Sequence, residues 1–214
     1  MGCRAVAAAA CVAVASLVAA PAPASPRTGL RPCSHGYSYA GYAGREGSDD
    51  VSATIAALSR PSVATGHAAA WVGVGGVHAG RGGASEWLQT GLAAFPRLGL
   101  RLYVEELSHG QARRLVDLGP AVVGRRYRFR VRETGADVWR AFVDGRAVGR
   151  PAYLPTDNAG SWRPVLTAES WAAGSAECNR YAYRFDDITV PLAGAERIGA
   201  PVTRDRSGLG FSAG

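Results

Sequence analysis

The feature that most constrains the fold is a series of short runs in which apolar and polar residues alternate, separated by glycine-rich connections. Alternation at a period of two puts apolar side chains on one face of a β-strand and polar side chains on the other. Strands of this length and spacing are typical of antiparallel sandwiches. We therefore expect an all-β antiparallel sandwich with strands at residues 37–44, 51–58, 67–74, 86–95, 98–107, 127–133, 138–143, 165–171 and 181–190.

Two local signals refine this strand pattern. Asp144-Gly145 stands between two apolar runs, and both residue types tolerate the positive φ of a tight hairpin turn, so a hairpin is expected there. Residues 111–118 could instead form a short helix, because Ser108 could cap its start and Gly119-Pro120 would end it.

The N-terminus has the pattern of an export signal. Arg4 supplies a positive charge, residues 5–20 are apolar, and Ala22-Pro23-Ala24 offers small residues for cleavage after Ala24. The apolar run is shorter than the ~20 residues that cross a bilayer. We expect a signal peptide at 1–24, a secreted, extracellular protein and no membrane anchor.

The remaining 190 residues (214 − 24) suit one domain. Residues 25–36 form an arm rich in Pro, Ser and Arg, the sandwich domain spans 37–192, and 193–214 are expected to be a flexible tail. Cys33 and Cys178 are the cysteines left after the signal is removed. In an exported protein they favour one disulfide over two separate thiols.

The charge balance argues against nucleic acid as a partner. The net charge of +7 comes entirely from arginines, which are scattered instead of clustering with aromatic rings. At residues 126–132, four arginines alternate with Tyr127, Phe129 and Val131. A solvated outer sheet face is the more usual meaning of this pattern, and an anion-binding stripe is the alternative.

Three strands would turn polar and aromatic side chains to one sheet face. The sets that share a side are Trp87 with Gln89, Tyr103 with Glu105, and Glu169 with Trp171. If these strands lie close together, one concave surface collects an amide, two carboxylates and several rings, as ligand clefts often do. His67, His78 and His109 lack ligand spacing, so no metal site is expected.

The order of several segments resembles the glutamic peptidases, or eqolisins. The segments that carry the resemblance are Tyr39-Ala-Gly-Tyr-Ala43, Ala70-Trp-Val-Gly-Val-Gly75, Leu88-Gln-Thr-Gly-Leu92, Tyr103-Val-Glu105, Ala168-Glu169 and 185–190. The resemblance covers about residues 37–190. Ala93-Ala94 stand where the family often has an acidic residue, and Leu107 replaces an aromatic one.

The resemblance implies a concanavalin A-like jelly roll of two seven-stranded sheets with a substrate groove on its concave face. Glu169 would be the general base and acid and Gln89 the oxyanion donor, acting on a polypeptide substrate at acidic pH without a cofactor. Trp71, Trp87, Tyr103, Glu105 and Trp171 would line the groove. We expect a monomer.

Other functions are also compatible with the sequence. Gln89 could bridge backbone groups of the sheet, and Glu169 could pair with an arginine. The main alternative to an endopeptidase is a binding module for carbohydrate or peptide on the same sandwich. A retaining glycosidase would need two carboxyl groups about 5–5.5 Å apart, and only Glu105 with Glu169 could supply them. The fold could also have kept no site at all.

Overall fold

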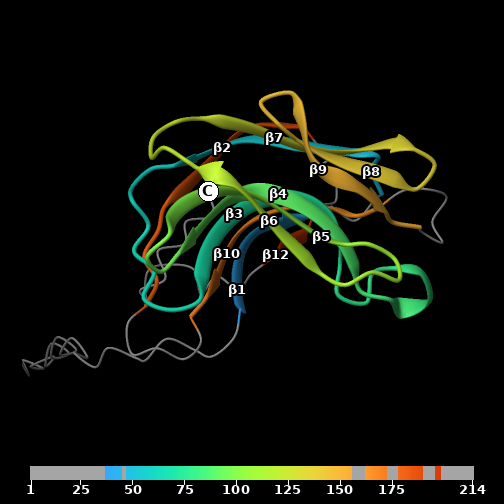
Figure 1. Cartoon of the computed structure of the whole chain (residues 1–214), viewed down its shortest axis with the longest axis horizontal. Helices are drawn as coiled ribbons and strands as arrows, with labels where there is room; N and C mark the ends of the chain where they lie inside the picture. The colour runs from blue at the N-terminus through green and yellow to red at the C-terminus, as the bar shows by residue number, and fades with distance from the viewer. Residues whose placement is uncertain (1–36, 45–46, 156–161, 173–177, 190–195, 199–214) are drawn as a thin grey trace, which may run out of the picture. The chain divides into compact units, whose positions relative to one another are not determined.

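The computed structural model describes residues 37–44, 47–155, 162–172, 178–189 and 196–198. Within them the chain is all β, apart from a single 3-10 turn at Arg81–Gly83, and the strands form two antiparallel sheets. This confirms the expected all-β sandwich. Figure 1 shows the sheets stacked as two layers, the larger one curved with its hollow face turned away from the smaller.

The larger sheet carries the strands with the candidate residues. Its order is β12-β1-β10-β3-β4-β5-β6. The strands span Glu196–Ile198 (β12), Tyr37–Ala43 (β1), Pro164–Trp171 (β10), His67–Gly76 (β3), Glu86–Phe95 (β4), Gly99–Leu107 (β5) and Arg114–Pro120 (β6).

The smaller sheet covers the convex face of the larger one. Its order is β11-β2-β7-β8-β9. The strands span Tyr183–Thr189 (β11), Asp50–Ala57 (β2), Tyr127–Gly135 (β7), Val138–Val143 (β8) and Arg146–Tyr153 (β9). The described residues therefore give sheets of seven and five strands, where the resemblance implied seven and seven.

The core lies between the two sheets and follows the period-two pattern. Leu88 and Leu92 of β4 face Phe129 and Val131 of β7 in one buried cluster, which also contains Trp139. The arginines that alternate with these β7 residues point outward. Arg130 forms a two-pronged ion pair with Asp50, and Arg126 pairs with Asp187, so this is the solvated outer face that the pattern favours.

The expected hairpin is confirmed, and the expected helix is wrong. Asp144 and Gly145 have φ of 49° and 79°, and they join β8 to β9. Residues 114–120 form the edge strand β6. Val116 and Leu118 pack against the core from this strand. A helix of about two turns is marginal alone, whereas pairing with β5 satisfies the backbone and buries these side chains.

The chain ends fall largely outside the described residues. The predicted signal at 1–24, the arm at 25–36 and Cys33 lie there, so cleavage and the Cys33–Cys178 disulfide stay predictions. Of the segment expected to be a flexible tail, residues 196–198 pair with β1 and belong to the sheet, which places part of the fold beyond residue 192. The described residues include no helix with the length and hydropathy to span a membrane.

The packing predicts a sharp contrast between two leucines. Leu88 is fully buried, and Leu98 is 64% exposed. We expect Leu88→Ala to lower the free energy of unfolding by about 2–5 kcal/mol, because it leaves a cavity between the sheets. Leu98→Ala should stay within about 0.5 kcal/mol of the unsubstituted protein. Urea unfolding measures both, and equal losses would contradict this core assignment.

Candidate active site

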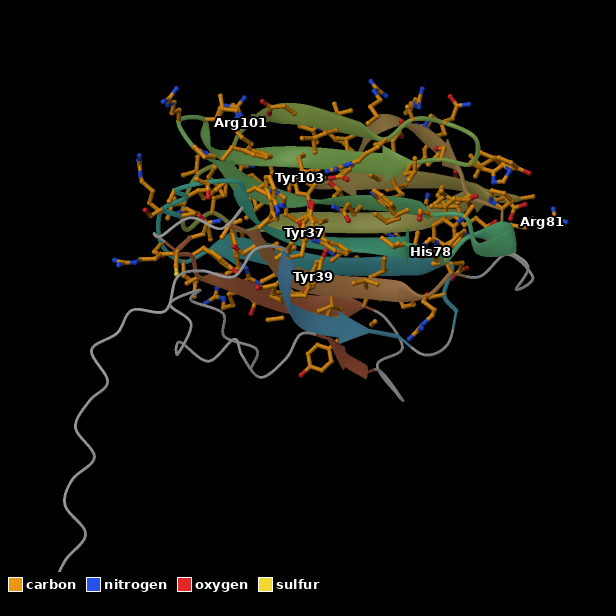
Figure 2. The ribbon with its side chains drawn as sticks, turned by 90° about the horizontal axis from the view of Figure 1, so that it is seen from below. Tyr37, Tyr39, His78, Arg81, Arg101 and Tyr103 are labelled. Atoms are coloured by element: carbon orange, nitrogen blue, oxygen red, sulfur yellow. The ribbon has the colours of Figure 1, made fainter. Side chains whose placement is uncertain are left out.

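The candidate residues lie on the hollow face of the larger sheet. On β4, Leu88 and Leu92 point to the core, so Gln89 between them points to the opposite face. The same alternation turns Glu169 on β10 and Trp71 on β3 to that face. Figure 2 looks onto this face, with Tyr37, Tyr39 and Tyr103 near its middle.

The strand order brings Gln89 and Glu169 to opposite sides of β3. Gln89 pairs with Gly73 across one edge of β3, and Glu169 pairs with Ala69 across the other. A Cβ on Gly73 would lie 2.8 Å from the Cβ of Gln89. Because glycine has no side chain, β3 leaves room at this position for the side chains of Gln89 and Glu169 on the hollow face.

The Glu169 carboxylate is held by two donors. His67 Nε2 donates to Oε1 at 2.6 Å, and Trp71 Nε1 donates to Oε2 at 3.0 Å. Both donors come from β3, so one rigid strand fixes the orientation of the carboxylate. Within the described residues, the partners of Glu169 are thus an imidazole and an indole. The alternative, in which Glu169 pairs with an arginine, is not what these residues show.

The Gln89 side chain is oriented by the neighbouring strand β5. Its Nε2 donates to the Tyr103 hydroxyl at 3.2 Å. A primary amide has two N–H donors, so this bond leaves one N–H available to a ligand.

Glu105 lies beside Gln89 and is paired with an arginine. Gln89 and Glu105 are direct partners across β4 and β5. Arg113, just before β6, donates from Nε to Glu105 Oε1 at 2.6 Å. Glu105 therefore accepts a hydrogen bond from a partner within the protein itself.

These side chains surround one cleft and a smaller neighbouring cavity. The cleft has a volume of about 440 Å³, and both Gln89 and Glu169 line it, together with Tyr37, Tyr39, Trp71, Trp87, Glu105, Arg113 and the 74–77 segment. The cavity measures about 30 Å³ and shares Gln89, Glu105, Arg113 and Glu169 with the cleft. An amide and a carboxylate from distant parts of the chain thus face the same open space.

Of the predicted lining residues, Trp71, Trp87 and Glu105 line the cleft, and Tyr103 lines the smaller cavity. Trp171 is absent from both linings; it is 37% exposed and its ring lies 6.4 Å from that of Tyr37.

The lining residues that were missed as site residues include Tyr37, Tyr39, His67 and Arg113. Parity could have found His67, because it shares a strand face with Trp71. Arg113 had no such signal, since it precedes its strand.

Burial raises the pKa of three tyrosines at this face, Tyr37, Tyr39 and Tyr103. For Tyr39, burial is the main cause, and the Glu169 carboxylate adds to it. The pKa of Tyr103 is raised by burial first and then by Glu169 and Glu105, since a phenolate would lie among carboxylates. The hydroxyls of Tyr39 and Tyr103 therefore stay protonated donors. No three His, Cys, Asp or Glu side chains gather as metal ligands in the described part of the chain.

The fold is similar to several solved structures. Scytalido-glutamic peptidase with a peptide-based transition-state analogue matches with a TM-score of 0.51 and 17% identity, over 75% of this chain and 86% of that chain. The eqolisin SCP-B in complex with the tripeptide Ala-Ile-His gives 0.45 and 17%, over 75% and 86%. A carbohydrate-binding module from Bacillus subtilis gives 0.38 and 13%, over 73% and 82%.

At these identities the similarity shows the β-sandwich fold alone. The similar structures include peptidases as well as a carbohydrate-binding module. No protein-family model and no curated protein sequence matches the chain.

The buried tyrosines predict a loss of stability at alkaline pH. An unfolded tyrosine has a pKa of about 10. Because the folded pKa of Tyr39 and Tyr103 is higher, their contribution is fully present below pH ~10 and is lost as the pH rises above it.

Urea unfolding at rising pH should show this decline, and Tyr39→Phe should reduce it. Tyrosinate absorbance supplies the second measurement. If Tyr39 and Tyr103 ionise near pH ~10 while the protein stays folded, the account of their surroundings is wrong.

Proposed function

We propose that this chain is a secreted, acid-active endopeptidase in which Glu169 activates water and Gln89 stabilises the oxyanion. The observation that supports it most is that these two side chains, from β10 and β4, line one cleft. Secretion rests on the export signal in residues 1–24. The similarity to the eqolisins at the motif level and the shared fold support the same reaction.

Glu169 is arranged as a general base. Its oxygens accept one hydrogen bond each, from His67 and Trp71. A carboxylate has about four lone-pair sites, so each oxygen can still accept from water. In the proposed reaction, Glu169 takes a proton from a water that attacks the scissile carbonyl carbon, and then gives that proton to the leaving nitrogen.

Gln89 would bind the carbonyl oxygen as it becomes negative. The bond to Tyr103 fixes the amide and leaves one N–H for this oxygen. A donor held in place before the reaction stabilises developing charge without rearrangement. An amide also keeps its N–H donors at every pH, whereas a carboxyl group in its place would need to be protonated. This suits a site that works in acid, where the base is ionised and side-chain carboxyl groups of the substrate are neutralised.

The cleft walls suit an extended peptide. Trp71, Trp87 and Tyr39 provide flat apolar surfaces, and Gly75 and Gly76 also line the cleft. Apolar walls with a few convergent polar groups are typical of ligand sites.

A second candidate function is glycan binding at the edge of this cleft. Tyr37 is 50% exposed, and its ring lies between that of Tyr39 at 5.8 Å and that of Trp171 at 6.4 Å, with interplanar angles of 10° and 26°. Stacked rings of this kind, with Tyr37 and Trp171 exposed to solvent, suit the flat faces of sugars. A non-catalytic binding module would use this aromatic platform without the dyad.

Digestion of casein at acidic pH tests the peptidase proposal. We expect Glu169→Gln to lower kcat/KM by at least about 10²-fold, since it removes the base. Gln89→Ala should cost about 10²–10³-fold, as loss of an oxyanion donor does. Glu133→Gln on β7 and Gln111→Ala in an exposed loop are matched controls outside the cleft and should keep full activity.

Activity that survives both dyad substitutions would show that the assignment is wrong. A folded wild-type protein without any activity would favour the binding module.

The glycan candidate has its own measurement. In affinity electrophoresis with soluble polysaccharides, a binding module would be retarded, and Trp171→Ala and Tyr37→Ala would abolish the retardation. Leu58→Ala, at another exposed apolar residue, serves as the control. Equal mobility of all variants in every polysaccharide gel would reject this function.

A further inference from the structure

Arg113 stands at the boundary between the large cleft and the small cavity. Its side chain is 53% exposed, and it lines both spaces together with Gln89, Glu105 and Glu169. Nε is bonded to Glu105, and the guanidinium also interacts with the Tyr37 hydroxyl. A guanidinium has five N–H donors, so several remain for a ligand.

The two sides of the dyad differ in size. The cleft has room for several residues in about 440 Å³, whereas the cavity offers about 30 Å³. The cavity floor is apolar and tightly packed, with Ala69, Ala93 and Tyr103 buried together and Phe95 against them. A space of this size accepts a methyl group but no large side chain.

The two sides also differ in charge. The side chains that line only the large cleft carry no charge, His67 lines the cavity, and Arg113, Glu105 and Glu169 line both spaces. His67 and Arg113 each already face a carboxylate, Glu169 and Glu105 respectively. The remaining donors of Arg113 are therefore placed for one additional anion beside the small cavity.

We propose that Arg113 binds the α-carboxylate of a substrate whose last residue is small, so that the dyad also removes a single C-terminal glycine or alanine. This inference rests on the proposed peptidase function and adds a carboxypeptidase activity to it. When an internal peptide bond is cut, the substrate continues past Arg113 and must displace its side chain. A substrate that ends at Arg113 needs no such displacement.

The α-carboxylate fits acidic conditions better than a side-chain carboxylate. Its ordinary pKa is about 3.3–3.7, compared with about 3.9 for Asp and about 4.3 for Glu. As the pH falls, the α-carboxylate thus remains ionised longest, and arginine stays charged throughout.

The reaction is a hydrolysis and needs no further reactant. Water adds to the last peptide carbonyl, its proton passes through Glu169 to the leaving nitrogen, and the C–N bond breaks. The products are a peptide shortened by one residue and a free small amino acid, whose carboxylate is held by Arg113.

The test compares N-acetyl-Leu-Ala-Leu-Phe-Ala as the free acid and as the C-terminal amide at acidic pH, with products identified by mass spectrometry. We expect the wild type to release alanine from the acid with a kcat/KM at least about tenfold above that for release of alaninamide from the amide, because a charge-assisted hydrogen bond is lost in the amide. Arg113→Gln should reduce this ratio to about one. Arg101→Gln, which removes a guanidinium paired with Asp117 on the outer strands, should keep it.

Equal cleavage of acid and amide by the wild type would overturn this inference and leave the peptidase proposal standing. If neither peptide is cut, tryptophan fluorescence of the Glu169→Gln variant reports binding of the two peptides. Tighter binding of the acid that depends on Arg113 would support the carboxylate site although the peptidase proposal fails. Equal binding would reject the carboxylate site as well.

Discussion

The structure depends on burial of one face of each strand between two sheets. Because side chains alternate at a period of two, fixing Leu88 and Leu92 in the core fixes Gln89 on the opposite face, and a slip of one residue would invert all three. The same constraint on β3 and β10 sends Trp71 and Glu169 to that hollow face. Burial of the core residues thus determines the direction in which the polar side chains of the cleft point, although these side chains are not part of the core.

Ion pairs complete the arrangement around the larger sheet. On the hollow face, Glu169 meets His67 and Glu105 meets Arg113. On the core side, the fully buried Glu106 is paired with Arg150 of β9. A buried carboxylate without a partner is costly, so each of these partners stabilises a carboxylate that the strand pattern places inside the protein. The pairs on the hollow face also fix the carboxylates for contact with a ligand.

Much of this arrangement could be predicted from the sequence, because the sandwich and the faces of Gln89 and Glu169 follow from local alternation. That Gln89 and Glu169 lie close together could not be predicted from the sequence. Their closeness depends on the position of β3 between β4 and β10, and this pairing joins segments that are distant along the chain. The helix expected at residues 111–118 was wrong because residues that can start and end a helix also flank the edge strand β6. Arg113, which precedes that strand, reaches Glu105 only through the tertiary fold, so no sequence period could reveal it.

In the proposed mechanism, Gln89 and Glu169 act on one peptide bond from opposite sides of β3. A crystal structure of the Glu169→Gln variant with a bound peptide tests it most directly. We predict that one peptide carbonyl oxygen lies within hydrogen-bond distance of Gln89 Nε2, with its carbon facing residue 169 across a water molecule. A peptide bound away from these side chains, or bound only along the rings of Tyr37 and Trp171, would contradict this mechanism.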